Sequence, residues 1–280
     1  VAAVGGGSVI DLAKAGAGLL KAPMPVAAYH DGESIPPSTI PFVVAPTTAG
    51  TGSEATMVSV LTNTETGVKK SVRHPSFMAR SVVLDPELLD SCLKHVIAAS
   101  GMDAFTQAIE SYCSVGATWF TDALALKAVA LIHSSLEAVY NGDKTKQEGL
   151  LLGSYLAGIA LSNARLGIVH GLAHPLGARY HVPHGLACAV CLPHALAFNR
   201  EAVPEKFKQL KAIVGMDIEP YVNDLLQRME VRSPFAGKTL DAYEGIIEET
   251  LASGSTKSNP RKVKADDVVC LLDRLFAPVK

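Results

Sequence analysis

The sequence lacks any long run of charge of one sign. Its 25 Lys and Arg residues and 27 Asp and Glu residues give a formal net charge of -2, and the longest basic stretches are pairs such as Lys69 and Lys70. A protein that binds nucleic acid needs a concentrated positive surface to neutralise phosphates. We therefore expect no nucleic-acid partner.

The sequence also has few long apolar runs. The longest that we find, near residues 150–161, is interrupted by Gly153, Ser154 and Gly158, whereas a membrane-spanning helix needs about 20 apolar residues. The first residues do not have the charged and then apolar pattern of a secretion signal. We therefore expect no membrane partner and a cytoplasmic location.

Cysteines are few and irregularly spaced. The chain has 5 of them, an odd number without the spacing of a disulfide framework. Cys188 and Cys191 form a CxxC pair, but their neighbours are apolar and the sequence contains no second CxxC. We expect both to be buried reduced thiols rather than a zinc knuckle or a redox pair.

The composition is that of a well-buried globular protein, and its periodicity changes near residue 92. Before that point, short apolar strands are predicted at residues 1–4, 41–46, 55–61 and 81–84, with a helix over 9–20 and a hairpin turn at 63–67. After it, helices are predicted over residues 93–112 with a break at Gly101, 120–140, 146–164, 204–213, 218–229, 240–251 and 265–275, in addition to those of a histidine-rich segment. We predict an α/β domain over residues 1–92 and an all-helical domain over residues 93–280.

The first predicted strand runs into Gly5, Gly6, Gly7 and Ser8, where a helix begins. Ser8 and Asp11 have the S-x-x-D spacing of a capping box. A glycine turn between a strand and a helix can bind an anion, because its backbone N–H groups are free and the helix dipole favours negative charge. Such turns also occur without a ligand, so the turn alone leaves both interpretations open.

A second polar loop follows the strand at residues 41–46. It contains the hydroxyl side chains of Thr47, Thr48, Thr51 and Ser53 together with two glycines. Backbone and side-chain donors of such a loop can surround a polar ligand. The alternative is a polar turn that leads into the next strand.

Five of the 9 histidines lie between residues 165 and 194: His170, His174, His181, His184 and His194. The first two are four residues apart and share one face of a helix. Pro183 fits the first turn of the next helix and places His184 at its start. Neutral imidazole is a common ligand for zinc and iron, so we interpret the segment as a candidate metal site. The alternative is that each is a core or capping histidine.

Asp103 lies among apolar residues of a predicted helix, where an unpaired carboxylate would be costly. Gln107 is four residues later on the same face, and we expect Glu110, on a neighbouring line, to be a solvated residue. An aspartate with two or three histidines suits Zn²⁺ or Fe²⁺. Alternatively, Asp103 only complements the helix dipole.

Five motifs together resemble the iron-containing alcohol dehydrogenase family, which shares its fold with glycerol dehydrogenase and dehydroquinate synthase. They are GGGSVIDLAK at residues 5–14, APTTAGTGSEAT at 45–56, DPELL at 85–89, GMDAFTQAIESY at 101–112 and HGLAHPLGARYHVPHG at 170–185. The resemblance implies a dehydroquinate synthase-like fold. In it, a partial Rossmann-like dinucleotide-binding domain precedes an all-α metal-binding domain, with the metal in the cleft between them.

The resemblance also implies roles for individual residues. The pyrophosphate of NAD or NADP would lie at the glycine turn and the nicotinamide along the second polar loop. The implied cofactor-binding residues are Gly5, Gly6, Gly7, Ser8, Asp11, Thr47, Thr48, Thr51, Ser53 and Lys69. Asp103, His170 and His184 fall on metal-ligand positions. His174 falls on a position usually assigned to proton relay or orientation.

Two departures from the family pattern stand out. Gln107 replaces a histidine that iron-dependent members use as a ligand, so the implied metal set is Asp103, Gln107, His170 and His184. The neutral amide oxygen of Gln107 should weaken iron binding and shift preference toward zinc or toward a more labile metal. Family members also carry a further stretch before the glycine turn, so we expect this chain to lack the first part of the nucleotide-binding domain. Apolar sheet edges at residues 1–4 and 42–44 would then be uncovered, which favours association or instability, and we expect a homo-oligomer, a dimer.

The implied activity is reversible hydride transfer between a small alcohol or aldehyde and NAD or NADP, with bound Fe²⁺ or Zn²⁺ acting on the alcohol oxygen. His174 would exchange the proton or orient the substrate. One alternative is a non-catalytic helical scaffold with a degraded metal site. Another is a dehydroquinate synthase-like lyase, which needs a basic cluster for which only Arg165 and Arg179 are candidates near the histidines.

Overall fold

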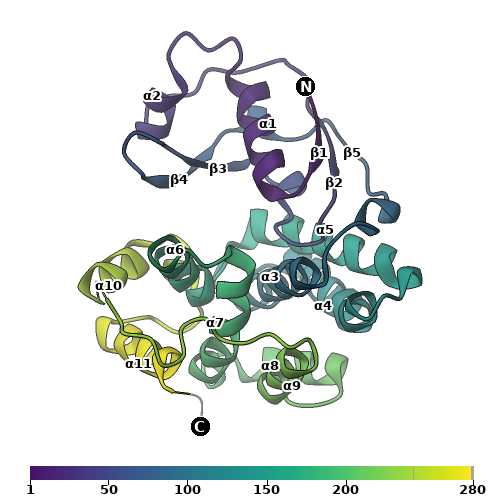
Figure 1. Ribbon diagram of the computed structural model, residues 1–280, viewed down its shortest axis with the longest axis vertical. Helices are drawn as coiled ribbons and strands as arrows, with labels where there is room; N and C mark the ends of the chain where they lie inside the picture. Colours follow the sequence, from purple (N-terminus) through teal and green to yellow (C-terminus); the bar gives the residue numbers. More distant parts are fainter. Residues whose placement is uncertain (242, 279–280) are drawn as a thin grey trace.

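The computed structural model describes residues 1–241 and 243–278. Strands occupy the first third of the chain and helices the remainder (Figure 1). The elements are β1 (Ala2–Gly5), α1 (Gly7–Leu19), α2 (Val26–Asp31), β2 (Val43–Pro46), β3 (Val58–Thr62), β4 (Lys69–Arg73), β5 (Ser81–Val82), α3 (Lys94–Cys113), α4 (Trp119–Tyr140), α5 (Gln147–Ala164), α6 (Ile168–Tyr180), α7 (His184–Asn199), α8 (Pro204–Val214), α9 (Ile218–Arg228), α10 (Tyr243–Ala252) and α11 (Ala265–Phe276). This confirms the predicted fold class, a partial α/β unit followed by a helical one.

A parallel sheet forms the centre of the first part. Its strand order is β1-β2-β5, with Ala2 opposite Val43 and Val43 opposite Ser81. Helix α1 connects β1 to β2 and covers one face of the sheet. Side chains that point to this face form a small core together with α1: Ala3, Ile10, Ala17, Phe42 and Val44. The carboxyl ends of β1 and β2 therefore open beside the N-terminus of α1.

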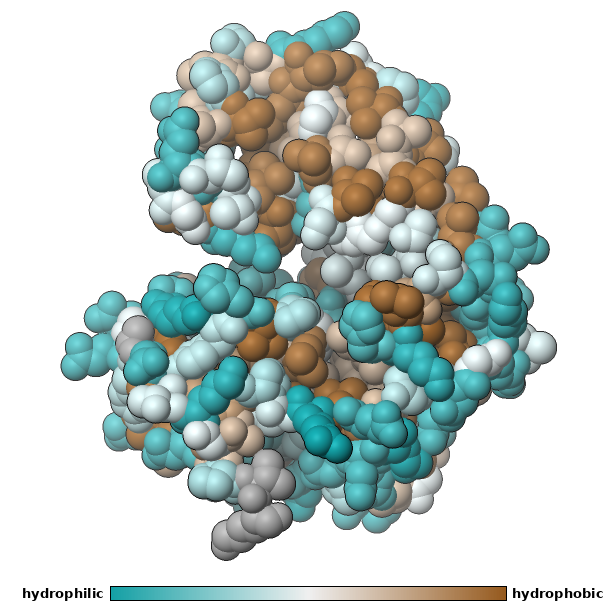
Figure 2. Space-filling model, in the orientation of Figure 1, coloured by the Kyte–Doolittle hydropathy of each residue, from teal (hydrophilic) through white to brown (hydrophobic). Residues whose placement is uncertain are grey.

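The other face of the sheet remains open. Val4, Val43 and Val83 are 63%, 39% and 50% exposed, and apolar side chains cover much of the upper part of the surface in Figure 2. The prediction that residues 42–44 are uncovered is wrong for Phe42 and Val44, because alternate side chains of a strand point to opposite faces and these two lie under α1. The dimer that we inferred from uncovered strands stays a prediction.

An antiparallel hairpin of β3 and β4 lies beside the sheet, with Val58 opposite Arg73. The predicted turn at residues 63–67 is confirmed. The backbone N–H of Gly67 donates to the carbonyl of Asn63 at 2.8 Å, and Gly67 has a φ of +70°.

Helix α3 is the centre of the helical part and packs against α4, α5 and α7. Its residues from Gly101 to Cys113 are all buried. The predicted break at Gly101 is wrong, since α3 is continuous over 20 residues. Gly101 instead allows α4 to approach closely, because a Cβ there would lie 2.2 Å from Cδ1 of Leu136.

The other predicted helices are present with ends shifted by up to three residues, and α2 was not predicted. The helix predicted over residues 240–251 includes residue 242, which lies outside the described residues. The domain limits at 92 and 93 stay a prediction; strand β5 ends at Val82 and α3 begins at Lys94, and residues 279–280 lie outside the described part.

The expectation that the chain has no apolar run long enough to cross a membrane is wrong for α4. Its 22 residues are long and apolar enough to cross a membrane, and residues 144–164 together with α6 also meet the criteria of length and composition but are bent by 104°. Core helices meet these criteria too, and α4 packs against α3 and α5 with Ala125, Val129 and Ile132 buried. Its length and composition therefore decide nothing about a membrane.

Candidate active site

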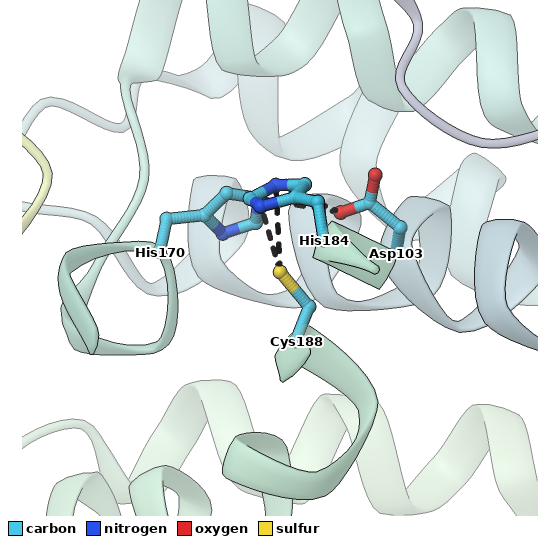
Figure 3. Close-up of side chains that lie close together, drawn as sticks. All are labelled: Asp103, His170, His184 and Cys188. Atoms are coloured by element: carbon cyan, nitrogen blue, oxygen red, sulfur yellow. Dashed lines mark hydrogen bonds and ion pairs between the residues drawn. The ribbon is translucent and has the colours of Figure 1, made fainter. Parts of the chain in front are cut away.

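Three helices bring Asp103, His170 and His184 together. Asp103 comes from α3, His170 from α6 and His184 from the first residue of α7, and Figure 3 shows their side chains converging. Oδ1 of Asp103 lies 3.4 Å from Nε2 of His170 and 3.8 Å from Nε2 of His184. Residues that are 67 and 14 positions apart in the chain therefore meet at one point, as the metal-site prediction requires.

The start of α7 is fixed by its sequence. Pro183 is the N-cap residue, and it cannot continue α6 because it has no N–H to donate. Gly185 then lets α7 touch α3: a Cβ at this position would lie 2.3 Å from the carbonyl oxygen of Ala99 and 3.4 Å from Cβ of Asp103. The close approach places His184 beside Asp103.

Cys188 is a fourth member of this cluster. Its Sγ lies 3.6 Å from Nε2 of His184 and 3.8 Å from Nε2 of His170, and the four donor atoms all lie within 4.8 Å of one another. The prediction of buried, reduced thiols is confirmed for Cys188 and Cys191, but Cys188 does more than fill the core. Its spacing of four residues from His184, which puts both on one face of α7, was the signal in the sequence.

Glu110 also belongs to the site, so the expectation of a solvated residue is wrong. It is 6% exposed, because α3 is enclosed by other helices. Its Oε2 lies 2.6 Å from Nδ1 of His170, and its Oε1 accepts the backbone N–H of Val169 at 2.7 Å. The carboxylate therefore holds both the ring and the first turn of α6.

The charges of the cluster influence one another. Burial favours a raised pKa for Asp103, but His184 and His170 outweigh it and hold that pKa below its usual value. Burial also favours a lowered pKa for His170, yet Cys188, Asp103 and Glu110 raise it well above the usual value. Carboxylates and a thiol thus surround the two imidazoles closely enough to attract a positive charge.

The residues fit a metal ion. Oδ1 of Asp103 is buried and has no hydrogen-bond partner among the described residues. Zinc–nitrogen bonds of about 2.0–2.1 Å and zinc–sulfur bonds of about 2.3 Å, in a tetrahedron, separate the donor atoms by roughly 3.3–3.6 Å. The observed separations of 3.4–3.8 Å are close to these values.

Gln107 lies one helical turn after Asp103. It is 3% exposed, and its Oε1 likewise has no hydrogen-bond partner among the residues that the structure describes. Its role as a ligand stays a prediction.

A cavity of about 980 Å³ connects the cluster to the glycine turn. Asp103 and His184 line it on one side, and on the other lie five of the predicted cofactor-binding residues: Gly6, Gly7, Ser8, Thr48 and Thr51. The turn and the polar loop touch, because a Cβ at Gly7 would lie 2.7 Å from Cγ2 of Thr51. The cavity therefore extends from the glycine turn to Asp103.

The predicted capping box is wrong. The N-cap of α1 is Gly6, without a side-chain hydrogen bond. The carboxylate of Asp11 instead accepts the hydroxyl of Ser53 at 2.5 Å and the backbone N–H of Val60 at 3.0 Å. Asp11 and Ser53 thus tie the polar loop and the hairpin to α1, and the large cavity is not lined by them, by Gly5 or by Thr47.

Lys14 completes this junction and was missed in the sequence. It is fully buried and donates to the carbonyl oxygens of Ser53 and Val58 at 2.6 and 2.7 Å. Burial lowers its pKa to about 8, and the same burial raises the pKa of neighbouring Glu54 to about 7. No pattern in the sequence marks a lysine of α1 as buried.

His174 and Lys69 line a second cavity, of about 440 Å³, with Arg73 and Arg165. Figure 2 shows the hollow on the left, between the β3–β4 hairpin and α6. His174 is exposed there, and its ring centroid is 5.0 Å from that of His184. Although the side chain is exposed, partial desolvation by the surrounding protein, together with the charges of His184, His170 and Lys69, lowers the pKa of His174. Lys69 is thus on the histidine side, away from the glycine turn.

Comparison with known proteins gives two family matches that cover most of the chain. Residues 97–276 match the C-terminal part of the Fe-containing alcohol dehydrogenase family, and residues 1–86 match the iron-containing alcohol dehydrogenase model. The chain is 39% identical over 281 residues to a probable alcohol dehydrogenase, EutG, of Escherichia coli strain K12, covering 97% of this chain and 71% of that protein. It is 34% identical to the lactaldehyde reductase of the same strain, covering 95% and 74%.

Solved structures agree with these matches. A 1,3-propanediol oxidoreductase superposes with a TM-score of 0.92 at 33% identity, over 98% of this chain and 76% of that one. A sulfoacetaldehyde reductase from Bifidobacterium kashiwanohense, in complex with NAD+, also gives a TM-score of 0.92, at 28% identity over 98% and 75%. The fold is therefore shared along nearly the whole described chain.

Proposed function

Because the chain belongs to the iron-containing alcohol dehydrogenase family, we propose that it is a metal-dependent, NAD- or NADP-linked alcohol dehydrogenase and aldehyde reductase. The observation that carries the proposal is the convergence of Asp103, His170 and His184 beside the cavity that contains the glycine turn. When bound, Fe²⁺ or Zn²⁺ would polarise the substrate oxygen, and the nicotinamide would give or take the hydride.

The chain's own residues would divide the remaining work. Asp103, His170 and His184 would hold the metal, with Gln107 as a further candidate. Thr48, Thr51 and the turn at residues 6–8 would hold the dinucleotide, since they line the cavity that reaches Asp103. The backbone N–H groups at the start of α1 suit a pyrophosphate.

His174 would orient the substrate. A neutral imidazole donates a hydrogen bond from one ring nitrogen and accepts one at the other. The ring lies beside His184 and faces the second cavity. A neutral imidazole at this place can position the substrate hydroxyl and pass its proton toward solvent.

A small substrate fits the second cavity, which Val60, Leu161 and Leu166 make partly apolar. The names of the similar proteins, lactaldehyde reductase and 1,3-propanediol oxidoreductase, support small aldehydes and alcohols as the class to test first. The complex of a similar protein with NAD+ supports a nicotinamide cofactor. A cytoplasmic location, a homodimer and the absence of nucleic-acid or membrane partners stay predictions from the sequence.

The test is a reduction assay with both nicotinamides. We expect protein reconstituted with Zn²⁺ or Fe²⁺ to oxidise NADH or NADPH in the presence of short aldehydes, and His184→Ala to lose this activity. His194→Ala, on the same helix, is the matched control and should retain it. If metal-loaded, folded protein turns over no aldehyde with either nicotinamide, the proposal fails and the scaffold alternative is favoured.

A further inference from the structure

We propose that Sγ of Cys188 is a ligand of the metal ion, so that the site is Asp103, His170, His184 and Cys188 and takes Zn²⁺ in preference to Fe²⁺. The inference rests on the proposed function only in that both concern the same metal. It adds a ligand that the sequence did not predict and names the ion that the donor set favours.

The first argument for a metal ligand is the position of the sulfur atom. Sγ of Cys188 lies 3.6 and 3.8 Å from the Nε2 atoms of His184 and His170. Around a tetrahedral zinc ion, a sulfur and a nitrogen ligand are about 3.5 Å apart. Four of the six separations between donor atoms are thus close to those around one zinc ion, and all of the donor atoms lie within 4.8 Å of one another.

The second argument is the set of groups that surround the thiol. Cys188 is free and buried, and the hydrogen-bond contacts that its sulfur makes among the described residues are those with the two histidines. Figure 3 shows the sulfur pointing from α7 toward both rings. A cysteine that only filled the core would have no reason to face two nitrogen atoms that themselves face a carboxylate.

Gln107 is the competing donor. Its amide oxygen is neutral and hard, whereas a cysteine loses its proton on binding and gives zinc an anionic, soft sulfur. The sulfur also lies within 3.8 Å of two other donor atoms, the Nε2 atoms of His170 and His184. We therefore assign Cys188, and not Gln107, as the fourth ligand.

The donor set explains the choice of ion. Thiolate ligands favour zinc, and two imidazoles and one carboxylate are compatible with it. A set with Gln107 in place of Cys188 would favour zinc only by binding iron less tightly, because it contains no soft thiolate. Catalytic zinc sites sometimes expand to five ligands, and the proposed function requires such an expansion when the substrate binds to a metal with four protein ligands.

Cobalt substitution tests the ligand directly. Protein stripped with a chelator and reloaded with Co²⁺ is expected to show a near-ultraviolet sulfur-to-cobalt charge-transfer band. The band should disappear in Cys188→Ser and Cys188→Ala and persist in Cys191→Ser, which alters a thiol three residues further along α7 with similar burial. Zinc affinity, measured by chelator competition, should fall at least about tenfold in the Cys188 variants.

Metal-free thermal unfolding of Cys188→Ala, which adds no new polar group to the site, shows whether the variant is folded. If wild-type protein binds Co²⁺ without the band, or if the band survives in Cys188→Ala, the inference is overturned while the proposed function stands. The same holds if Gln107→Ala, and not Cys188→Ala, costs the zinc affinity. If wild-type protein binds neither Co²⁺ nor Zn²⁺, the inference and the metal-dependent function are both overturned.

Discussion

Oε2 of Glu110 lies 2.6 Å from Nδ1 of His170, while Nε2 of the same ring lies 3.4 Å from Oδ1 of Asp103. A carboxylate accepts a hydrogen bond, so Glu110 favours the proton on Nδ1 and leaves the lone pair of Nε2 directed toward the metal site. Glu110 contacts Nδ1 of His170 and not the Nε2 that would bind the metal. It thereby selects which nitrogen of the ring can bind an ion.

Replacing Glu110 by Gln should therefore weaken metal binding. The amide keeps the shape but can donate as well as accept, which no longer fixes the tautomer of His170. We expect zinc affinity to fall about 10–100-fold, measured by competition with a chelator. Glu148→Gln, an exposed glutamate of α5, is the control. Equal affinities of wild type and Glu110→Gln would contradict the prediction.

Removal of His170 should empty the site. His170 is 3% exposed and contacts Asp103, Glu110 and Cys188, so alanine removes the central donor. Elemental analysis of protein purified without chelator should find close to a full equivalent of metal in wild type and almost none in His170→Ala. His194→Ala should retain the wild-type amount. Full occupancy in His170→Ala would place the metal elsewhere.

Sequence patterns predicted the helices well because buried faces repeat with helical period, and the order of the motifs predicted the meeting of Asp103 with the histidines. Patterns did not reveal which helix faces lie against each other. Glu110 and Lys14 look like solvated residues in the sequence, yet α3 is enclosed by other helices and Lys14 meets the polar loop. Gly101 led to the predicted break because glycine has a low helix propensity. The sequence did not show that the same glycine allows α4 to pack closely against α3.

The contact at Gly185 yields a third prediction. A methyl group there would lie 2.3 Å from the carbonyl oxygen of Ala99, so Gly185→Ala should push α7 away from α3 and cost about 1–3 kcal/mol of unfolding free energy. His184 would move with α7, and zinc affinity should fall as well. Gly16→Ala is the matched control, because nothing lies within 4 Å of a Cβ at that helical position.

Gly16→Ala should stabilise the protein by about 0.5–1 kcal/mol. Denaturant unfolding of both variants, together with chelator competition, separates the two effects. If Gly185→Ala matched Gly16→Ala in stability and in zinc affinity, the close approach of α7 to α3 would not be what positions His184.

The pH dependence of stability gives the last prediction. Burial raises the pKa of Glu54 from 4.5 to about 7, so the folded protein binds this proton more tightly than the unfolded chain does. The resulting stability is fully present below pH 4.5 and is lost as the pH rises through about 7. Glu54→Gln stays uncharged and should lack this loss, which is on the order of 2–3 kcal/mol.

The free energy of unfolding of wild type and Glu54→Gln, measured at pH 5 and at pH 7, checks this prediction. The difference between the two proteins is compared, because the histidines of the metal site titrate in both and their contributions cancel. Lys14 acts in another window, since burial lowers its pKa to about 8 and its contribution changes only above that pH. Glu65→Gln, at the exposed hairpin turn, should keep the wild-type slope. A slope in Glu54→Gln equal to that of wild type would mean that Glu54 is ionised at neutral pH and paired with Lys14.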